Sequence, residues 1–292
     1  MRRACLALAA VALAAPALAE KPPVVLAPQG DWEILIEDES CIAARLFEGD
    51  GEPHLFKLEQ FGPSGAVSMS AFGPAFRPFI NLQPTELRFR EGQRLHKSNP
   101  FTAVLPGFDK GIVYGSVTPN WDQLAELAAA GTPATKQPVE LDVETGRKIA
   151  FVGFQQGGRP EVRIATGSME GVFQSLNGCT YALLEKWGLD AVRLRSALRS
   201  PALLNSKKTW GELRKAYRSN AQQGERGVIV LRATISENGT MESCALIDTA
   251  TSGNLAPAIC EVIGKAQFAP AIDASGQPFR ALYIQTLKFQ TS

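Results

Sequence analysis

Residues 227–247, GVIVLRATISENGTMESCALI, have the pattern of a β-hairpin. From Gly227 to Ser236 apolar and polar side chains alternate along a strand. The apolar face consists of Ile229, Leu231, Ala233 and Ile235. Glu237-Asn238-Gly239 then marks a tight turn, because Asn and Gly tolerate positive φ angles. Met241–Ile247 returns as the second strand, so this stretch predicts two antiparallel strands.

A helix and one more strand are expected after this hairpin. An apolar stripe at helical spacing predicts a helix over Leu255–Lys265. The stripe consists of Leu255, Ala258, Ile259, Val262 and Ile263. Asp273–Pro278 has turn composition, and Arg280–Gln290 has the pattern of a long last strand. The order strand, strand, helix, strand indicates a small α+β unit.

The first part of the chain contains many short strand candidates with turn signals between them, which predicts antiparallel sheet structure. The candidates are Trp32–Ile36, Ile42–Phe47, His54–Phe61, Ala66–Phe72, Leu87–Arg90, Gly111–Val117, Lys148–Phe154 and Glu161–Thr166. The first ordered block is expected to begin at Trp32, after a Pro-rich extended segment. Two helices are expected, one over Trp121–Ala130 and one over Met169–Trp187. We therefore expect an α+β fold, with a β-rich N-terminal domain that ends in a helix and a small ββαβ domain after it.

The first 19 residues have the composition of a signal peptide. Arg2 and Arg3 precede an apolar run, and Ala17-Leu18-Ala19 matches the small-x-small site that signal peptidase cleaves. The run is too short to span a bilayer as a helix, and an uncleaved anchor is the alternative. Cleavage after Ala19 would place the mature chain in the periplasm. The predicted division is signal peptide 1–19, N-terminal domain 20–195, a basic linker 196–209 and C-terminal domain 210–292.

Four cysteines remain after cleavage: Cys41, Cys179, Cys244 and Cys260. In an oxidising compartment an even number predicts two disulfide bonds, for which sequence alone allows three pairings. The local pairing of Cys244 with Cys260 is favoured, which leaves Cys41 with Cys179. No CxxC motif occurs, and neither histidine lies at a metal-ligand spacing from a cysteine, so no metal or cofactor is expected.

The composition and the motifs favour binding over catalysis. Lys and Arg number 30 and Asp and Glu 29, a balance that argues against a nucleic-acid partner. No GxSxG elbow and no phosphate-binding loop occurs. His54 and His96 lie in polar stretches and are expected to be exposed, and Glu37-Asp38-Glu39 is expected to form a solvated turn. We therefore expect no enzymatic activity.

The last block resembles the C-terminal domain of TonB-type energy transducers, from about Trp210 to Phe289. The resemblance rests on the hairpin tip Asn238-Gly239, the following Ser252-Gly253 and the segments Phe268–Ala271 and Gly276–Pro278. With Trp32 and Cys41 upstream and the pair Cys244 and Cys260, the chain is similar to exported alphaproteobacterial proteins that carry this domain. The expected C-terminal fold is thus a TonB-like ββαβ domain.

The resemblance implies a partner-binding edge. In that family an extended peptide, such as the TonB box of an outer-membrane receptor, adds as a strand to the edge of the small sheet. Here the edge would be the last strand, with the candidate residues Arg280, Leu282, Tyr283, Ile284, Thr286 and Lys288. The primary hypothesis is a periplasmic adaptor that binds an envelope protein or an extended peptide. The alternatives are a component of TonB-dependent energy transduction and transport, and an envelope enzyme or inhibitor with its site in the N-terminal domain.

Overall fold

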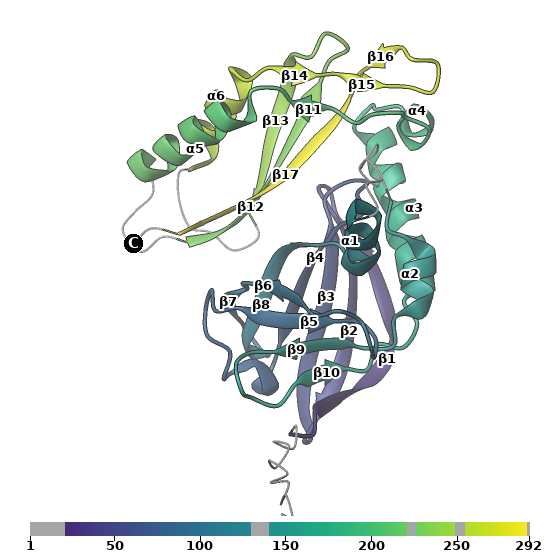
Figure 1. Cartoon of the computed structure of the whole chain (residues 1–292), viewed down its shortest axis with the longest axis vertical. Helices are drawn as coiled ribbons and strands as arrows, with labels where there is room; N and C mark the ends of the chain where they lie inside the picture. Colours follow the sequence, from purple (N-terminus) through teal and green to yellow (C-terminus); the bar gives the residue numbers. More distant parts are fainter. Residues whose placement is uncertain (1–20, 130–139, 221–225, 249–254, 291–292) are drawn as a thin grey trace, which may run out of the picture.

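The structure of the protein is a computed structural model that describes residues 21–129, 140–220, 226–248 and 255–290. The predicted signal peptide 1–19 lies outside these residues, as does Ser252-Gly253. Figure 1 shows two bodies stacked along the long axis. We call the described residues 21–197 the N-terminal body and the described residues 198–290 the C-terminal body. The mixed α+β fold predicted from the sequence is confirmed.

One ten-stranded sheet makes up most of the N-terminal body, in the order β6-β5-β9-β10-β1-β2-β3-β4-β8-β7. The strands are β1 (Val24–Ile36), β2 (Cys41–Gly49), β3 (Glu52–Gln60), β4 (Val67–Phe72), β5 (Thr85–Arg88), β6 (His96–Ser98), β7 (Phe101–Leu105), β8 (Asp109–Val117), β9 (Val152–Gln155) and β10 (Val162–Ile164). Neighbouring strands are antiparallel, except that β1 and β10 run parallel where Val24 pairs with Val162.

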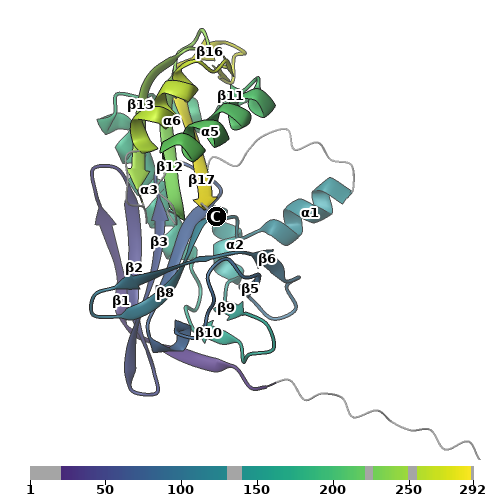
Figure 2. The same ribbon diagram turned by 90° about the vertical axis from the view of Figure 1, so that its left-hand side faces the viewer.

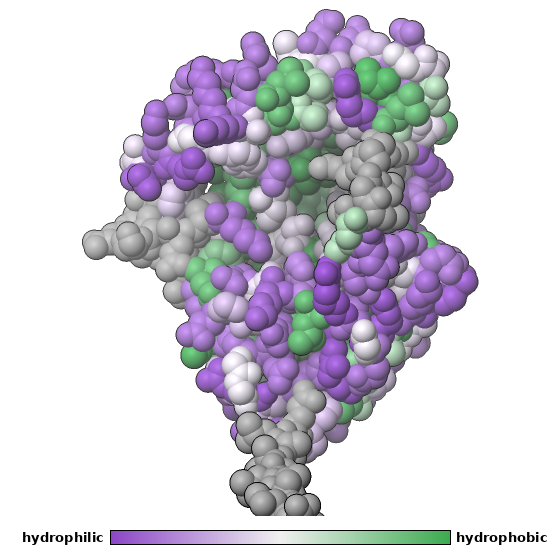
Figure 3. All heavy atoms as spheres, in the orientation of Figure 1, coloured by the Kyte–Doolittle hydropathy of each residue, from purple (hydrophilic) through white to green (hydrophobic). Residues whose placement is uncertain are grey.

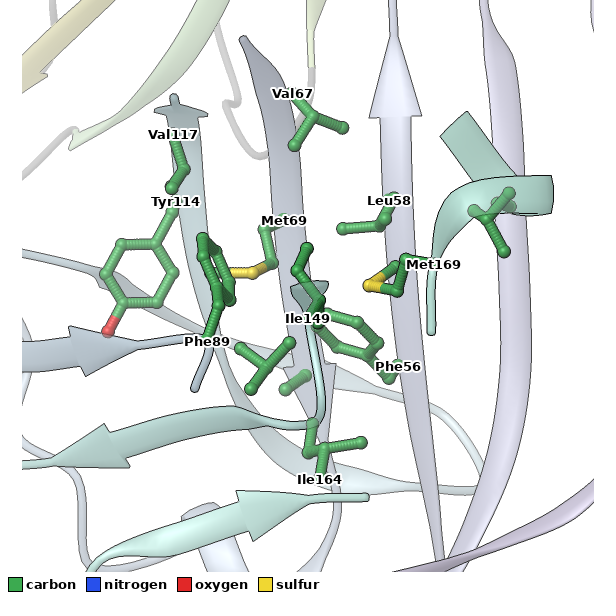
Figure 4. Packing of buried hydrophobic residues seen from close by; sticks show 14 of the residues in the cluster. Phe56, Leu58, Val67, Met69, Phe89, Tyr114, Val117, Ile149, Ile164 and Met169 are labelled. Atoms are coloured by element: carbon green, nitrogen blue, oxygen red, sulfur yellow. The ribbon is translucent and has the colours of Figure 1, made fainter. Parts of the chain in front are cut away.

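The sheet is strongly curled, because its two edge strands follow each other in the sequence. Strand β6 ends at Ser98 and β7 begins at Phe101, so only two residues separate the opposite edges of the sheet. Figure 2 shows the sheet bending round on itself. Large side chains fill the inside, and Figure 4 shows Phe56, Met69 and Tyr114 among these buried residues.

Short helices and one long helix complete the N-terminal body: η1 (Pro74–Phe76), α1 (Trp121–Ala129), α2 (Val143–Lys148), α3 (Glu170–Lys186) and α4 (Ala191–Arg195). Asp142 and Asp190 cap α2 and α4, because their carboxylates accept backbone N–H groups of the first turn. Helix α3 packs against the sheet, and the disulfide Cys41–Cys179 joins it to β2. The pairing expected for these two cysteines is confirmed.

The C-terminal body is a three-stranded antiparallel sheet in the order β13-β12-β17, covered on one face by two helices. Its elements are β11 (Ala202–Leu203), α5 (Ser206–Asn220), β12 (Arg226–Ile235), β13 (Met241–Asp248), α6 (Leu255–Gly264), β14 (Phe268–Ala269), β15 (Ala271–Ile272), β16 (Pro278–Phe279) and β17 (Ala281–Gln290). The face with Ile229 and Leu231 packs on Leu213 of α5 and Ile263 of α6. The disulfide Cys244–Cys260 joins β13 to α6, as the local pairing predicts.

The opposite face of this small sheet packs on the N-terminal body. Val228 and Val230 of β12 lie on that face, and both are 0% exposed. A Cβ atom added at Gly115 of β8 would lie 2.5 Å from Val228 Cγ1, and one added at Gly62 would lie 2.6 Å from Ile284 Cδ1. Glycine at these two positions therefore lets the two bodies approach each other closely.

The two bodies also share one apolar cluster. From the N-terminal body it takes Tyr181 and Leu184 of α3 and Leu194 of α4, and from the C-terminal body Phe279 and Leu282. Arg193 lies at the edge of this cluster and also joins the two bodies. Its guanidinium pairs with Asp273 at 2.6 Å and lies 4.8 Å from the ring centre of Phe279.

Several elements differ from the prediction. Strand β1 begins at Val24, before the expected Trp32, because β10 pairs with its first residues. Strands β6 and β7 and helices α2 and α5 were not predicted, and the expected linker 196–209 contains β11 and the start of α5. Within the described residues, no helix combines the length and the apolar character that crossing a membrane requires.

Candidate functional site

The outer edge of β17 is the candidate site. Strand β17 pairs with β12 along its whole length, from Ala281 opposite Ile235 to Gln290 opposite Arg226. Within the described part of the chain, no strand pairs with β17 on its other side. The expected position of the last strand at an edge of the small sheet is therefore observed.

The register shows which backbone groups of β17 point outward. The N–H of Ser236 donates to the carbonyl of Thr240 at 2.8 Å, so Ser236 directs its backbone groups toward β13. Because successive residues of a strand direct these groups to opposite sides, Ile235 and every second residue before it point toward β17. Their partners on β17 are Ala281, Tyr283, Gln285, Leu287 and Phe289.

The residues between these partners therefore direct their N–H and C=O groups away from the sheet. They are Leu282, Ile284, Thr286 and Lys288. The side-chain amide of Gln285 agrees with this assignment, since its Nε2 donates to the Thr286 carbonyl at 3.1 Å. Of the neighbours Tyr283 and Ile284, it is thus Ile284 that offers its N–H at the outer edge.

Most of the predicted site side chains have partners inside the molecule. Leu282 and Ile284 pack on Gly62, and the Thr286 hydroxyl donates to the Gly115 carbonyl at 3.3 Å. Tyr283 lies on the opposite face, with its ring centre 5.0 Å from that of Phe268.

Arg280, at the start of the strand, donates to the Gly188 carbonyl at 3.0 Å and pairs with Glu242. The outer edge consequently presents mainly backbone groups to a partner.

Lys288 differs from the other candidates. It is exposed and makes no ion pair within the residues that the structure describes. Nearby protein atoms still remove part of its hydration and lower the pKa of its ammonium group. The pKa of His96 is also lowered, first by burial and then by the charge of Lys288. The ring of His96 in turn stacks on that of Trp121, with ring centres 4.8 Å apart.

Figure 3 shows a hollow between the two bodies, on the side where Figure 1 places β17, with hydrophobic side chains on its floor. The outer edge of β17 therefore faces a recess with walls from both bodies.

The turn between β1 and β2 helps to hold the two bodies together. Asp38 pairs with Lys186 at 2.6 Å, and Glu39 forms an ion pair with Arg232 of β12. The guanidinium of Arg232 also lies 3.7 Å from the ring centre of Trp187. The expected solvated acidic turn is observed, since Glu37, Asp38 and Glu39 are all exposed, and two of its carboxylates also bind cations from α3 and from the other body.

His54 was expected to be exposed, but it is only 2% exposed. Its Nδ1 lies 3.0 Å from the Glu52 carbonyl, and its Nε2 accepts the N–H of Ala75 at 3.1 Å. Burial lowers the pKa of the ring, which keeps it neutral. It lies beside a cavity of about 410 Å³, also lined by Leu26, Phe79 and Arg159. The error arose because period-two alternation in β3 turns His54 inward together with Phe56.

Among the described residues, no three His, Cys, Asp or Glu side chains come together as metal ligands. The edge of β17 and the cavity beside His54 are thus two of the places in the described part of the chain where another molecule could bind.

Comparison with known families gives one match. Residues 216–291 match the family model of the Gram-negative bacterial TonB protein C-terminal domain, so the resemblance seen in the sequence is confirmed for this part of the chain. The match begins inside α5 and extends past β17, and it therefore includes the whole three-stranded sheet. Searches of curated proteins and of solved structures found no match.

Proposed function

We propose that this protein, which carries a TonB C-terminal domain, is a periplasmic adaptor that binds an extended segment of another envelope protein by strand addition. The observation that carries the proposal is the outer edge of β17. Every second residue there, from Leu282 to Lys288, directs its backbone N–H and C=O groups outward, and no other described strand forms hydrogen bonds with this edge. A segment that aligns there would extend the sheet to four strands.

The energetics favour an extended segment as the partner. Each added backbone hydrogen bond contributes about 0.5–1.5 kcal/mol net, so several in register are needed for measurable binding. Because the small sheet is held on one face by α5 and α6 and on the other by the N-terminal body, its edge is already ordered before a partner arrives. A preformed edge lowers the ordering cost of binding.

The proposed location follows from the chemistry of the cysteines and from the family. Two disulfide bonds of this kind persist in oxidising compartments, of which the periplasm is one. TonB proteins work in the Gram-negative envelope, and the sequence of residues 1–19 fits an export signal.

The test uses the backbone of Ile284. Ile284→Pro removes one outward N–H, which the pairing with β12 does not use, while Ile284→Ala removes the side chain but keeps that N–H. A photo-crosslinking amino acid at Gln285, whose side chain reaches the outward carbonyl of Thr286, should capture an envelope protein in intact cells in the Ala background but not in the Pro background.

The same crosslinker at Val192, which is 79% exposed on α4, serves as the control position. Equal capture in the Pro and Ala backgrounds would refute strand addition at this edge.

Energy transduction is the second candidate, and the family match favours it. In that case the chain would work with a membrane-anchored partner that supplies force. Deleting the gene should then abolish uptake through a TonB-dependent receptor, whereas a pure adaptor should leave uptake intact.

The cavity beside His54 favours a third candidate, an envelope enzyme or inhibitor. Both ring nitrogens of His54 already contact backbone groups, so a catalytic role would need another base. Isothermal titration with envelope metabolites would detect a small-molecule ligand there.

A further inference from the structure

We infer that the segment bound at β17 lies in the hollow between the two bodies and places a carboxylate side chain against Lys288. The inference rests on the proposed strand addition and names the chemistry of the partner. It also gives the N-terminal body a part in recognition, through His96 and Trp121.

The first step is the position of Lys288. Its backbone groups point outward, so an added strand would place one residue directly opposite it. In an antiparallel or parallel addition, the side chain of a residue opposite Lys288 projects on the same face of the sheet. That face is the one that carries Val228 and Thr286 and packs on the N-terminal body.

The second step is the charge. The ammonium group of Lys288 is exposed and has no carboxylate partner among the described residues. The imidazole of His96 carries no negative charge in either protonation state, so it cannot compensate the ammonium charge. An exposed ammonium group without an anion is available to pair with a carboxylate that the partner delivers. By contrast, Arg280 at the other end of the strand already pairs with Glu242.

The third step is the surroundings. The stacked rings of His96 and Trp121 form a flat wall near Lys288, fixed by the Trp121 Nε1–H, which donates to the Arg94 carbonyl at 2.8 Å. Because Lys288 is exposed, an ion pair formed beside this wall would be a solvated one that salt can screen. The site therefore selects an extended segment with Asp or Glu opposite Lys288.

The experiment uses the full chain and three synthetic peptides. Each peptide is a blocked heptapeptide of alternating Thr and Val, with Glu, Gln or Lys at its centre, and binding is followed by fluorescence anisotropy. The Glu peptide should bind about fivefold more tightly at low salt, and the preference should disappear at high salt because screening weakens exposed ion pairs.

Two variants and one control test Lys288 itself. Lys288→Glu should reverse the preference, so that a Lys-centred peptide binds better than the Glu peptide. His96→Glu should remove the preference, since it supplies Lys288 with a carboxylate from its own chain. Lys265→Glu changes the charge equally on α6, where Lys265 pairs with Glu261, and should leave the preference unchanged.

The outcomes separate this inference from the proposed function. Equal binding of the Glu and Gln peptides, still abolished by Ile284→Pro, would overturn the role of Lys288 and leave strand addition intact. Failure of both peptides to bind at millimolar concentration, or equal binding with and without Ile284→Pro, would contradict strand addition itself. A concentration-dependent dimer that Ile284→Pro abolishes would assign the edge to a second copy of the chain and overturn the inference.

Discussion

Gly115 offers a direct test of how the two bodies are docked. Its position on β8 leaves room for no side chain, because an added Cβ would lie 2.5 Å from Val228 Cγ1 and 2.7 Å from Thr286 Cγ2. Ordinary carbon–carbon contacts are about 3.5–4.0 Å, so in Gly115→Ala the small sheet must withdraw by roughly 1 Å. Overpacking of this kind costs about 1–3 kcal/mol.

The assay is urea unfolding of the purified, oxidised chain, with Gly158→Ala as the matched control. Nothing lies within 4 Å of a Cβ at Gly158, and its φ is not left-handed, so this substitution should stabilise the protein by about 0.4–1 kcal/mol through the unfolded state. The two glycine-to-alanine changes should therefore shift the free energy of unfolding in opposite directions. If Gly115→Ala behaves like Gly158→Ala, the close packing of β8 on β12 and β17 is refuted.

The remaining predictions concern the disulfide bonds and the buried histidine. Replacing Cys41 and Cys179 by Ala should lower the free energy of unfolding in urea by about 5 kcal/mol, since their bond spans 138 residues. Replacing Cys244 and Cys260, whose bond spans 16 residues, should lower it by about 3 kcal/mol. Equal losses would contradict the argument from loop length. His54 has a pKa below 6.5 in the folded protein, so protons bind more readily to the unfolded chain, and the stability present above pH 6.5 should fall as the pH drops through the folded pKa. His54→Gln should show a smaller loss of stability between pH 7.5 and pH 5 than the natural chain, measured by thermal unfolding at each pH.

The C-terminal sheet could be predicted from local patterns. The alternation in β12, the Asn238-Gly239 turn and the apolar stripe of α6 each depend on neighbours in the sequence, and each is observed. Gly239 has a φ of +77°, the conformation that the turn requires.

Other elements were missed although the sequence carried a signal. Trp210, Leu213 and Tyr217 are spaced three and four apart and mark the apolar side of α5, but no helix was predicted there, and the first residues of α5, including Lys207 and Lys208, were assigned to the linker. On β12, Val228 and Val230 occupy positions where a half-buried strand would carry polar side chains. Apolar residues on both faces are typical of a strand that is buried on both sides.

The composite character of the candidate site could not be predicted in the same way. The stacking of His96 on Trp121 near Lys288 joins three segments that are far apart in the sequence, and no periodicity reports such a contact. The outward direction of the Ile284 N–H likewise depends on the pairing of β17 with β12, a register that becomes visible only in the folded chain.

The docked face of the small sheet also limits where this polypeptide can be divided. A fragment trimmed to the family match would expose Val228, Val230, Leu282 and Ile284 to water on a face that in the whole chain is covered by the N-terminal body. Contiguous apolar surface of this kind promotes aggregation. The C-terminal body should therefore be poorly soluble when produced alone. The two bodies should also evolve together, without the recombination with other domains that independently folding domains allow.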